Sequence, residues 1–154
     1  MNVRSYQLQD TDVLARLFTA TVQSINIAHY SPEQVLAWAP DRPDMEAWRG
    51  EFARLICFVS ELDSEVVGFI SFEPDGHLEH LYVHSRFQRQ GVALALYQRV
   101  EEEAISRGIR RIFTEASITA RPFFERVGFR VIAPQEVKCR GVSFINYQME
   151  RLLT

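Results

Sequence analysis

The chain has 154 residues, 47% of them hydrophobic, which is enough apolar material for the core of one compact domain over residues 1–154. Its net charge of -3 argues against a nucleic-acid partner, because such partners usually require a basic face. No apolar run is long enough to cross a bilayer, and the first residues lack the apolar core of a signal peptide. We therefore expect a cytoplasmic protein with no membrane partner, and its two distant cysteines, Cys57 and Cys139, are expected to be free thiols.

The first third of the chain is predicted to form one strand and then helices. The apolar spacing predicts the strand and three helices over residues 3–8, 10–25, 31–40 and 45–54. Asp10 can cap the first of these helices, and Ser31 before a proline is a typical helix start. Aromatic residues are frequent in this part, which precedes the β-rich part of the chain.

The remaining two thirds are predicted to be richer in strands. The pattern predicts six strands over residues 55–62, 65–72, 77–83, 109–116, 129–137 and 142–152. Two helices are expected over residues 92–107 and 119–127. This order of elements indicates an α/β protein of the α+β kind, a mixed sheet with helices packed on it.

Residues 77–107 are the stretch that most clearly indicates a ligand-binding site. They are predicted to form a strand, a basic loop and a helix, with Gly91 at the mouth of the helix. A glycine there lets the backbone approach a ligand closely, and the free N–H groups and dipole at a helix start favour an anion. Arg86 and Arg89 add fixed positive charge. We interpret this stretch as a cradle for a pyrophosphate group.

Two motifs resemble those of the GNAT superfamily of N-acetyltransferases. Residues 88–93, QRQGVA, match the acetyl-CoA signature Q/R-x-x-G-x-G/A in its usual place between a strand and an amphipathic helix. Residues 117–129 resemble the second motif, N-x-x-A-x-x-L/F-Y-E-K-x-G-F. The resemblance implies a GNAT-like acyl-CoA N-acyltransferase fold, with a central, mostly antiparallel sheet flanked by helices. It also implies an enzyme that uses acetyl-CoA as co-substrate.

Two positions depart from the second motif. Phe124 stands where many members have the tyrosine assigned to protonate the departing CoA thiolate, and it has no proton to give. Ser117 stands where many members have an asparagine that bonds the pantetheine arm, and a serine can replace part of that bonding. The end of the chain, with Arg140-Gly141 and Asn146-Tyr147-Gln148-Met149, resembles the YafP-like branch of small bacterial members.

The resemblance implies a set of cofactor-binding residues on the strand, the cradle and the second motif. They are Leu81, Tyr82, Val83, Gln88, Arg89, Gln90, Gly91, Val92, Ala93, Ser117 and Phe124. The backbone of Leu81 and Val83 is expected to pair with the pantetheine arm. The Leu81 N–H is also the expected oxyanion donor, a contact worth about 3–4 kcal/mol in a transition state.

The acceptor amine must lose a proton, because an amine with a pKa near the lysine value of about 10 is charged at neutral pH. Glu79 is the candidate base, since strand alternation places it on one face with Leu81 and Val83. His80, on the opposite face, is the rival and is expected to be a packed histidine. For the thiolate, Tyr147 and Tyr30 are candidate acids or merely packing aromatics, and a thiolate can also leave without an acid.

A metal site is not expected. Strand alternation predicts that His77 and Glu79 lie on one face and His80 and His84 on the other, so that the four do not converge.

The acceptor amine, of a small molecule or a protein, is expected beside the segment between the first and third helices. The candidate acceptor-binding residues there are His29, Tyr30, Trp38 and Trp48, together with Glu79 and the final hairpin. The alternative is that Trp38 and Trp48 only form core.

Two functions therefore stay open: an acetyltransferase, or an acyl-CoA-binding module that Phe124 has made inactive. A phosphate-binding domain outside the family would explain the cradle but not the second motif. A homodimer is plausible because symmetric pairs are the commonest oligomers.

Overall fold

The structure, a computed structural model, describes residues 1–153. Within them lie seven strands, β1 (Asn2–Ser5), β2 (Ile56–Leu62), β3 (Glu65–Phe72), β4 (Leu78–Val83), β5 (Arg111–Ala116), β6 (Arg130–Cys139) and β7 (Val142–Leu152). The same residues form five α-helices, α1 (Thr11–Ser24), α2 (Pro32–Trp38), α3 (Met45–Arg54), α4 (Val92–Ser106) and α5 (Arg121–Arg126). Each element lies where the sequence predicts one, with ends that differ by a few residues.

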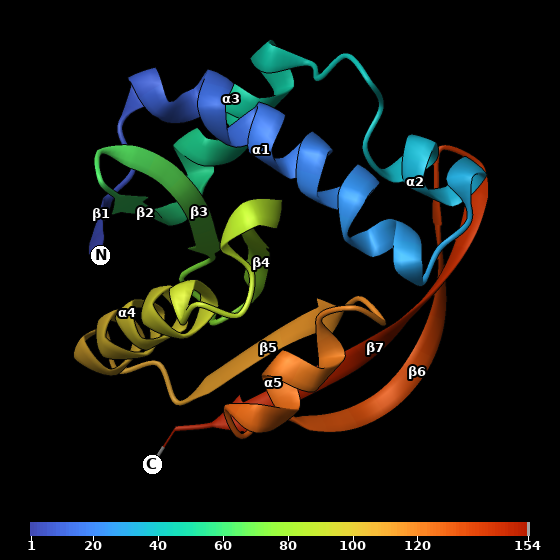
Figure 1. The fold of residues 1–154 in the computed structure, drawn as a ribbon. Helices are drawn as coiled ribbons and strands as arrows, with labels where there is room; N and C mark the ends of the chain where they lie inside the picture. The colour runs from blue at the N-terminus through green and yellow to red at the C-terminus, as the bar shows by residue number, and fades with distance from the viewer. Residues whose placement is uncertain (154) are drawn as a thin grey trace.

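The strands form two antiparallel sheets rather than one continuous sheet. The first has the order β1-β2-β3-β4 and the second the order β5-β7-β6. An isolated parallel bridge between His77 and Phe113 joins them where β4 and β5 begin. The prediction of a mostly antiparallel sheet flanked by helices is confirmed, but the sheet is split between β4 and β5 (Figure 1).

Helices cover both faces of the first sheet. Side chains that alternate along its strands point to opposite faces. Phe58 and Ile70 belong to the core beneath α4, whereas Val59 and Phe69 belong to the core beneath α1 and α3. In Figure 1 these helices accordingly lie on opposite sides of the sheet, with α2 beside β7 and α5 against the second sheet.

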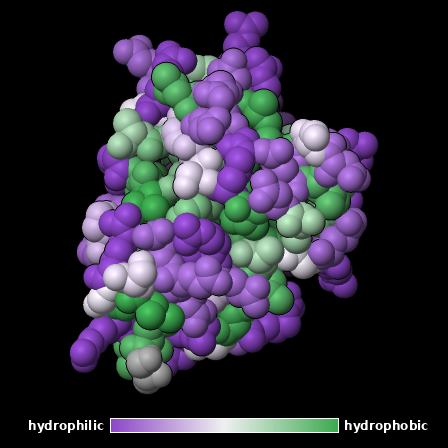
Figure 2. Space-filling model, turned by 90° about the vertical axis from the view of Figure 1, so that its left-hand side faces the viewer, coloured by the Kyte–Doolittle hydropathy of each residue, from purple (hydrophilic) through white to green (hydrophobic). Residues whose placement is uncertain are grey.

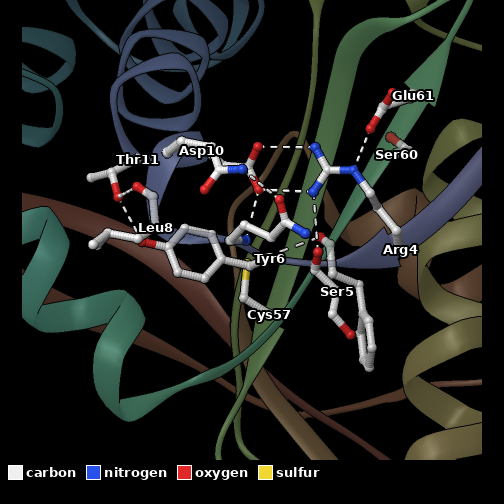
Figure 3. A network of polar contacts seen from close by, with 12 residues as sticks. Arg4, Ser5, Tyr6, Leu8, Asp10, Thr11, Cys57, Ser60 and Glu61 are labelled. Carbon is white, nitrogen blue, oxygen red and sulfur yellow. Dashed lines mark hydrogen bonds and ion pairs between the residues drawn. The ribbon is translucent and has the colours of Figure 1, made fainter.

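A polar network fastens the start of α1 to the first sheet (Figure 3). The guanidinium of Arg4 on β1 bonds both carboxylate oxygens of Asp10, at 2.8 and 2.9 Å, and also pairs with Glu61 of β2. Asp10 in turn accepts a bond from the Gln7 N–H at 2.8 Å. This local turn ends β1 at Ser5, so the prediction of a strand as far as residue 8 is wrong.

One face of the molecule is largely polar. Figure 2 shows hydrophilic side chains over most of the face that it presents, with hydrophobic residues in small separate patches. Among residues 1–153, no helix combines the length and the apolar character needed to cross a membrane.

Candidate active site

A long cleft opens where β4 and β5 part. It has a volume of about 1380 Å³ and is lined by both strands, by the start of α4, by α5 and by the segment after α1. The split between the two sheets thus exposes one side of β4 that a continuous sheet would cover. The cleft brings together most of the residues that the sequence predicts for cofactor binding, including Leu81, Tyr82, Val83, Gln88, Arg89, Gly91, Val92, Ala93, Ser117 and Phe124.

The cradle at the start of α4 has open space beside its glycine. Gly91 caps the helix in the left-handed conformation, with φ of 80°, which side chains rarely adopt. A Cβ built on Gly91 would meet no atom within 4 Å. The helix start therefore faces free space, as an anion site requires.

Three cradle side chains play parts that the sequence did not indicate. Gln88 donates from Nε2 to the Val83 carbonyl at 2.7 Å, so it fastens the loop to β4. Arg86 points away from the cleft, toward Glu65 at 3.3 Å, and does not line it. The positive charge that lines the cleft comes instead from Arg89 and from Arg126 on α5. Gln90, a predicted cofactor residue, donates its side-chain amide to the Arg86 carbonyl.

The backbone of β4 directs polar groups toward the cleft, although the Val83 carbonyl already accepts bonds from Gln88 Nε2 and the Thr21 hydroxyl. The His84 N–H donates to the Val67 carbonyl at 2.8 Å, next to the register pair of Val83 and Gly68. Paired residues of an antiparallel ladder alternate between bonded and non-bonded pairs. The N–H and C=O of Leu81 and Val83 therefore point away from β3, toward β5. This is the direction that pairing with a pantetheine arm requires.

Glu79 lines the cleft beside a charged histidine. His77 Nδ1 lies 3.3 Å from the Glu79 carboxylate and 2.7 Å from that of Glu73, and its Nε2 lies 2.7 Å from Glu115. Bonds to Glu115 and Glu73 outweigh burial and raise the pKa of His77 to about 9. Burial raises the pKa of the Glu79 carboxyl, and the His77 charge opposes that rise only in part. Glu79 thus combines access to the cleft with increased basicity.

The predicted alternation along β4 is wrong at Glu79. Ser71 pairs with His80 and Phe72 with Leu78, so Glu79 is the extra residue of a β-bulge. Leu78 takes the place on the core face of Leu81 and Val83 that alternation predicts for Glu79.

The bulge also brings Glu79 close to His80, which the sequence predicts to lie on the opposite face. Ligand-type atoms of Glu51, Glu79 and His80 lie within 4.8 Å of one another, and so do those of Glu73, His77 and Glu79. Groups of this size can hold a metal ion, although a protonated His77 offers it no lone pair. The expectation of no metal stays a prediction.

The candidate acids for the thiolate are engaged elsewhere. The Tyr30 hydroxyl donates to the Ile145 carbonyl at 2.9 Å and accepts from the Ile118 N–H at 2.9 Å. The ring of Tyr147 lies 4.5 Å from the Arg121 guanidinium and does not line the cleft. The structure therefore does not bring Tyr147 together with Glu79 and Leu81.

The predicted acceptor residues divide between two places. Tyr30 and His29 line the cleft, and His29 Nδ1 lies 2.9 Å from the Thr119 hydroxyl oxygen on its opposite wall. Trp48 lines a second, smaller hollow, and Trp38 borders both. The two tryptophans also pack on neighbouring aromatic rings, and their role in acceptor binding stays a prediction.

Comparison with known proteins places these features in a family. The model of the acetyltransferase (GNAT) domain matches residues 26–151, most of the chain. The chain belongs to the GNAT acetyltransferase family. GNAT relatives of known sequence include YafP, an uncharacterized N-acetyltransferase of Escherichia coli strain K12, which is 35% identical over 149 residues. That match covers 97% of this chain and 94% of YafP.

Solved GNAT structures share the fold. A GCN5-related N-acetyltransferase (aminotransferase, class II) from Rhodopseudomonas palustris superposes with a TM-score of 0.94 at 29% identity, covering 99% of this chain and 95% of that one. YncA of Salmonella typhimurium, a putative acetyltransferase solved with its cofactor acetyl-CoA, has a TM-score of 0.76 at 22% identity, covering 100% and 94%. The predicted family, its YafP-like branch, the fold and the enzyme class are confirmed.

Proposed function

We propose that this protein is an acetyl-CoA-dependent N-acetyltransferase that transfers an acetyl group directly to the amine of a small molecule or a protein. The observation that carries the proposal is the cleft between β4 and β5. It places the cradle, the outward-facing backbone of Leu81 and the carboxylate of Glu79 on one continuous surface. GNAT membership gives the reaction class, and the YncA structure, which has the same fold, holds acetyl-CoA.

The cradle and β4 fit two parts of acetyl-CoA, its pyrophosphate and its pantetheine arm. The open space beside Gly91 lets a pyrophosphate reach the first N–H groups of α4, with Arg89 and Arg126 nearby. The exposed edge of β4 would hold the pantetheine arm like a short added strand. When bound, acetyl-CoA supplies the thioester carbon that the amine attacks. The Leu81 N–H stabilises the negative charge that develops on the thioester oxygen.

Glu79 acts as the base in this proposal. Its half-buried carboxylate accepts a proton from the acceptor ammonium, directly or through a water molecule, and frees the nitrogen lone pair. A raised pKa brings the carboxyl closer to the amine in basicity, which favours the transfer. His77 forms an ion pair with the same carboxylate at 3.3 Å.

The thiolate leaves without a side-chain acid. Phe124 has no proton to give, and the Tyr30 hydroxyl is held by two backbone partners. A thiol with a pKa near the cysteine value of about 8.5 is a good leaving group, so the reaction does not require a tyrosine.

The test is the Glu79→Gln variant, measured by thiol release from acetyl-CoA with an amine acceptor. We expect kcat/KM to fall by about 100- to 10,000-fold, the contribution of general base catalysis. The variant should keep its rise in melting temperature on addition of acetyl-CoA. Glu73→Gln is the control, because Glu73 also bonds His77 but does not line the cleft. A fall of less than threefold in Glu79→Gln would contradict the role of base.

The acyl-CoA-binding module is the alternative that Phe124 motivates. It would bind acetyl-CoA without turnover on any amine, so the same assay separates the two functions.

We further propose that residues 1–154 form one domain and that the protein works in the cytoplasm. Strands from the first and last thirds of the chain share one core, and the free thiols Cys57 and Cys139 suit a reducing compartment. A homodimer stays a prediction.

A further inference from the structure

A second hollow of about 280 Å³ adjoins the cleft. It lies between α1, the segment that joins α2 to α3, the helix α3, β4 and the turn between β6 and β7. Trp38 borders both spaces, and Glu79 of the cleft lies next to His80 and Glu51 of the hollow. The floor of the hollow therefore lies beside the part of the cleft that Glu79 lines.

The floor of the hollow holds a buried imidazole with a free nitrogen. His80 is 9% exposed, and its Nδ1 lies 2.7 Å from the Ser71 hydroxyl oxygen. Its Nε2 has no hydrogen-bond partner among residues 1–153. Burial lowers the pKa of His80 to about 3, so the ring stays neutral. With Nδ1–H donating to Ser71, Nε2 offers a lone pair to the hollow.

Two carboxylates lie close to the His80 ring. Atoms of Glu51, Glu79 and His80 come within 4.8 Å of one another, and Arg54 pairs with Glu51 at 2.8 Å. An ammonium group carries three N–H donors, which match three converging acceptors. The floor therefore offers hydrogen-bond acceptors to an ammonium group, while Arg54 and the charged His77 balance the charges of its two carboxylates.

The walls are aromatic. Trp48 stacks on Phe52 at 5.3 Å and meets the edge of Phe18 at 4.9 Å, and both Trp48 and Phe18 line the hollow. Aromatic faces of this kind hold flat apolar groups and also attract cations. At the mouth, the exposed Arg42 and Arg140 outnumber the single carboxylate of Asp44, so a second ammonium group finds no excess of negative charge there.

We propose that this hollow holds the acceptor, a monoamine on a flat apolar body such as an aromatic ring. The ammonium bonds His80, Glu51 and Glu79, and the body lies against Trp48 and Trp38. This inference rests on the proposed acetyl transfer and names its acceptor class. Glu79 then takes the proton, which leaves the nitrogen lone pair free to attack.

The test compares phenethylamine, butylamine and spermidine as acceptors of the full chain, by thiol release from acetyl-CoA. We expect phenethylamine to have the highest kcat/KM. Glu51→Gln should raise the KM for phenethylamine by about tenfold or more, the loss of one charge-assisted bond, and leave the KM for acetyl-CoA unchanged. Glu46→Gln on the same helix is the control, since Glu46 is exposed and does not line the hollow. Trp48→Leu should raise the KM for phenethylamine more than that for butylamine.

Three outcomes would overturn the inference. Spermidine or butylamine could be the better substrate, or Glu51→Gln could leave the amine KM unchanged while turnover persists. Zn²⁺ or Mn²⁺ could raise the melting temperature of the wild type but not of Glu51→Gln, which would assign the cluster to a metal. In each case acetyl-CoA binding and thiol release would still support the proposed function. Failure of the proposed function itself would instead appear as no response to acetyl-CoA.

Discussion

His77 lies at the point where the two sheets join, and its raised pKa keeps it charged at neutral pH. Carboxylates face it from three sides, Glu73 at the start of the β3–β4 turn, Glu79 on β4 and Glu115 on β5. Its ring also stacks on Phe113 at 5.1 Å. The imidazolium therefore stabilises the folded state as long as it keeps its proton.

Stability should fall as the pH rises through the range in which His77 loses its proton. The folded pKa of about 9 lies above the ordinary value of 6.5, so the stabilisation is complete below pH 6.5 and is lost toward pH 9. His77→Gln should remove this slope. The measurement is the free energy of unfolding in urea from pH 6 to 9, and equal slopes in both proteins would contradict the account. Burial also raises the pKa of the Cys57 thiol, and the effect of this group on the pH dependence of stability is the same in both proteins.

Residues that form motifs could be predicted from the sequence, whereas residues that meet only in space could not. The sequence predicted Gly91, Leu81 and Glu79, because a signature and a strand position mark them. Glu51 lies far from Glu79 in the chain, and no motif links the two. Arg126 stands at the lysine position of the second motif, but the motif does not say which way the side chain faces, so only the packing of α5 reveals that it lines the cleft.

At the scale of elements, the cradle depends on one glycine at the start of α4. Gly91→Ala should lower the free energy of unfolding by about 1–2 kcal/mol, because a residue with a side chain is strained in the left-handed backbone conformation. Its Cβ meets no protein atom but fills the space expected for a phosphate, so the KM for acetyl-CoA should rise at least about tenfold. Gly108→Ala at the other end of α4, with φ of 74° and equal space, is the matched control. It should lose similar stability and keep its KM, and equal KM values in the two variants would contradict the cradle.

The helices and strands themselves could be predicted from apolar spacing and capping residues. The exceptions come from contacts between distant parts of the chain. β1 ends early because Arg4 reaches Asp10 and Glu61, and β4 begins one residue late because His77 pairs with Phe113 of the second sheet. The bulge at Glu79 has no local sequence signal, and it decides the direction of the carboxylate.

At the scale of the whole molecule, Gly76 in the β3–β4 turn lies against Arg111 of β5. This junction between the turn and β5 sets how the two sheets part. Gly76 has φ of 99°, and a Cβ there would lie 2.0 Å from the Arg111 carbonyl oxygen. Gly76→Ala should therefore cost about 2–4 kcal/mol, the left-handed strain plus displacement of β5. Gly141→Ala, in a turn with φ of 77° and open space, should cost only about 1–2 kcal/mol. Urea unfolding of the two variants checks this, and equal losses would mean that the junction is not rigid.

The central claim is that the cleft between the sheets binds acetyl-CoA through the cradle at the start of α4. Its most direct test is thermal unfolding of the full chain with increasing acetyl-CoA, beside Gly91→Ala and a series with ADP. A ligand that binds only the folded state raises the melting temperature steadily with its concentration. We predict such a rise for the wild type, a smaller rise with ADP, and a rise displaced to higher concentration in Gly91→Ala. An unchanged melting temperature at millimolar acetyl-CoA would contradict the account.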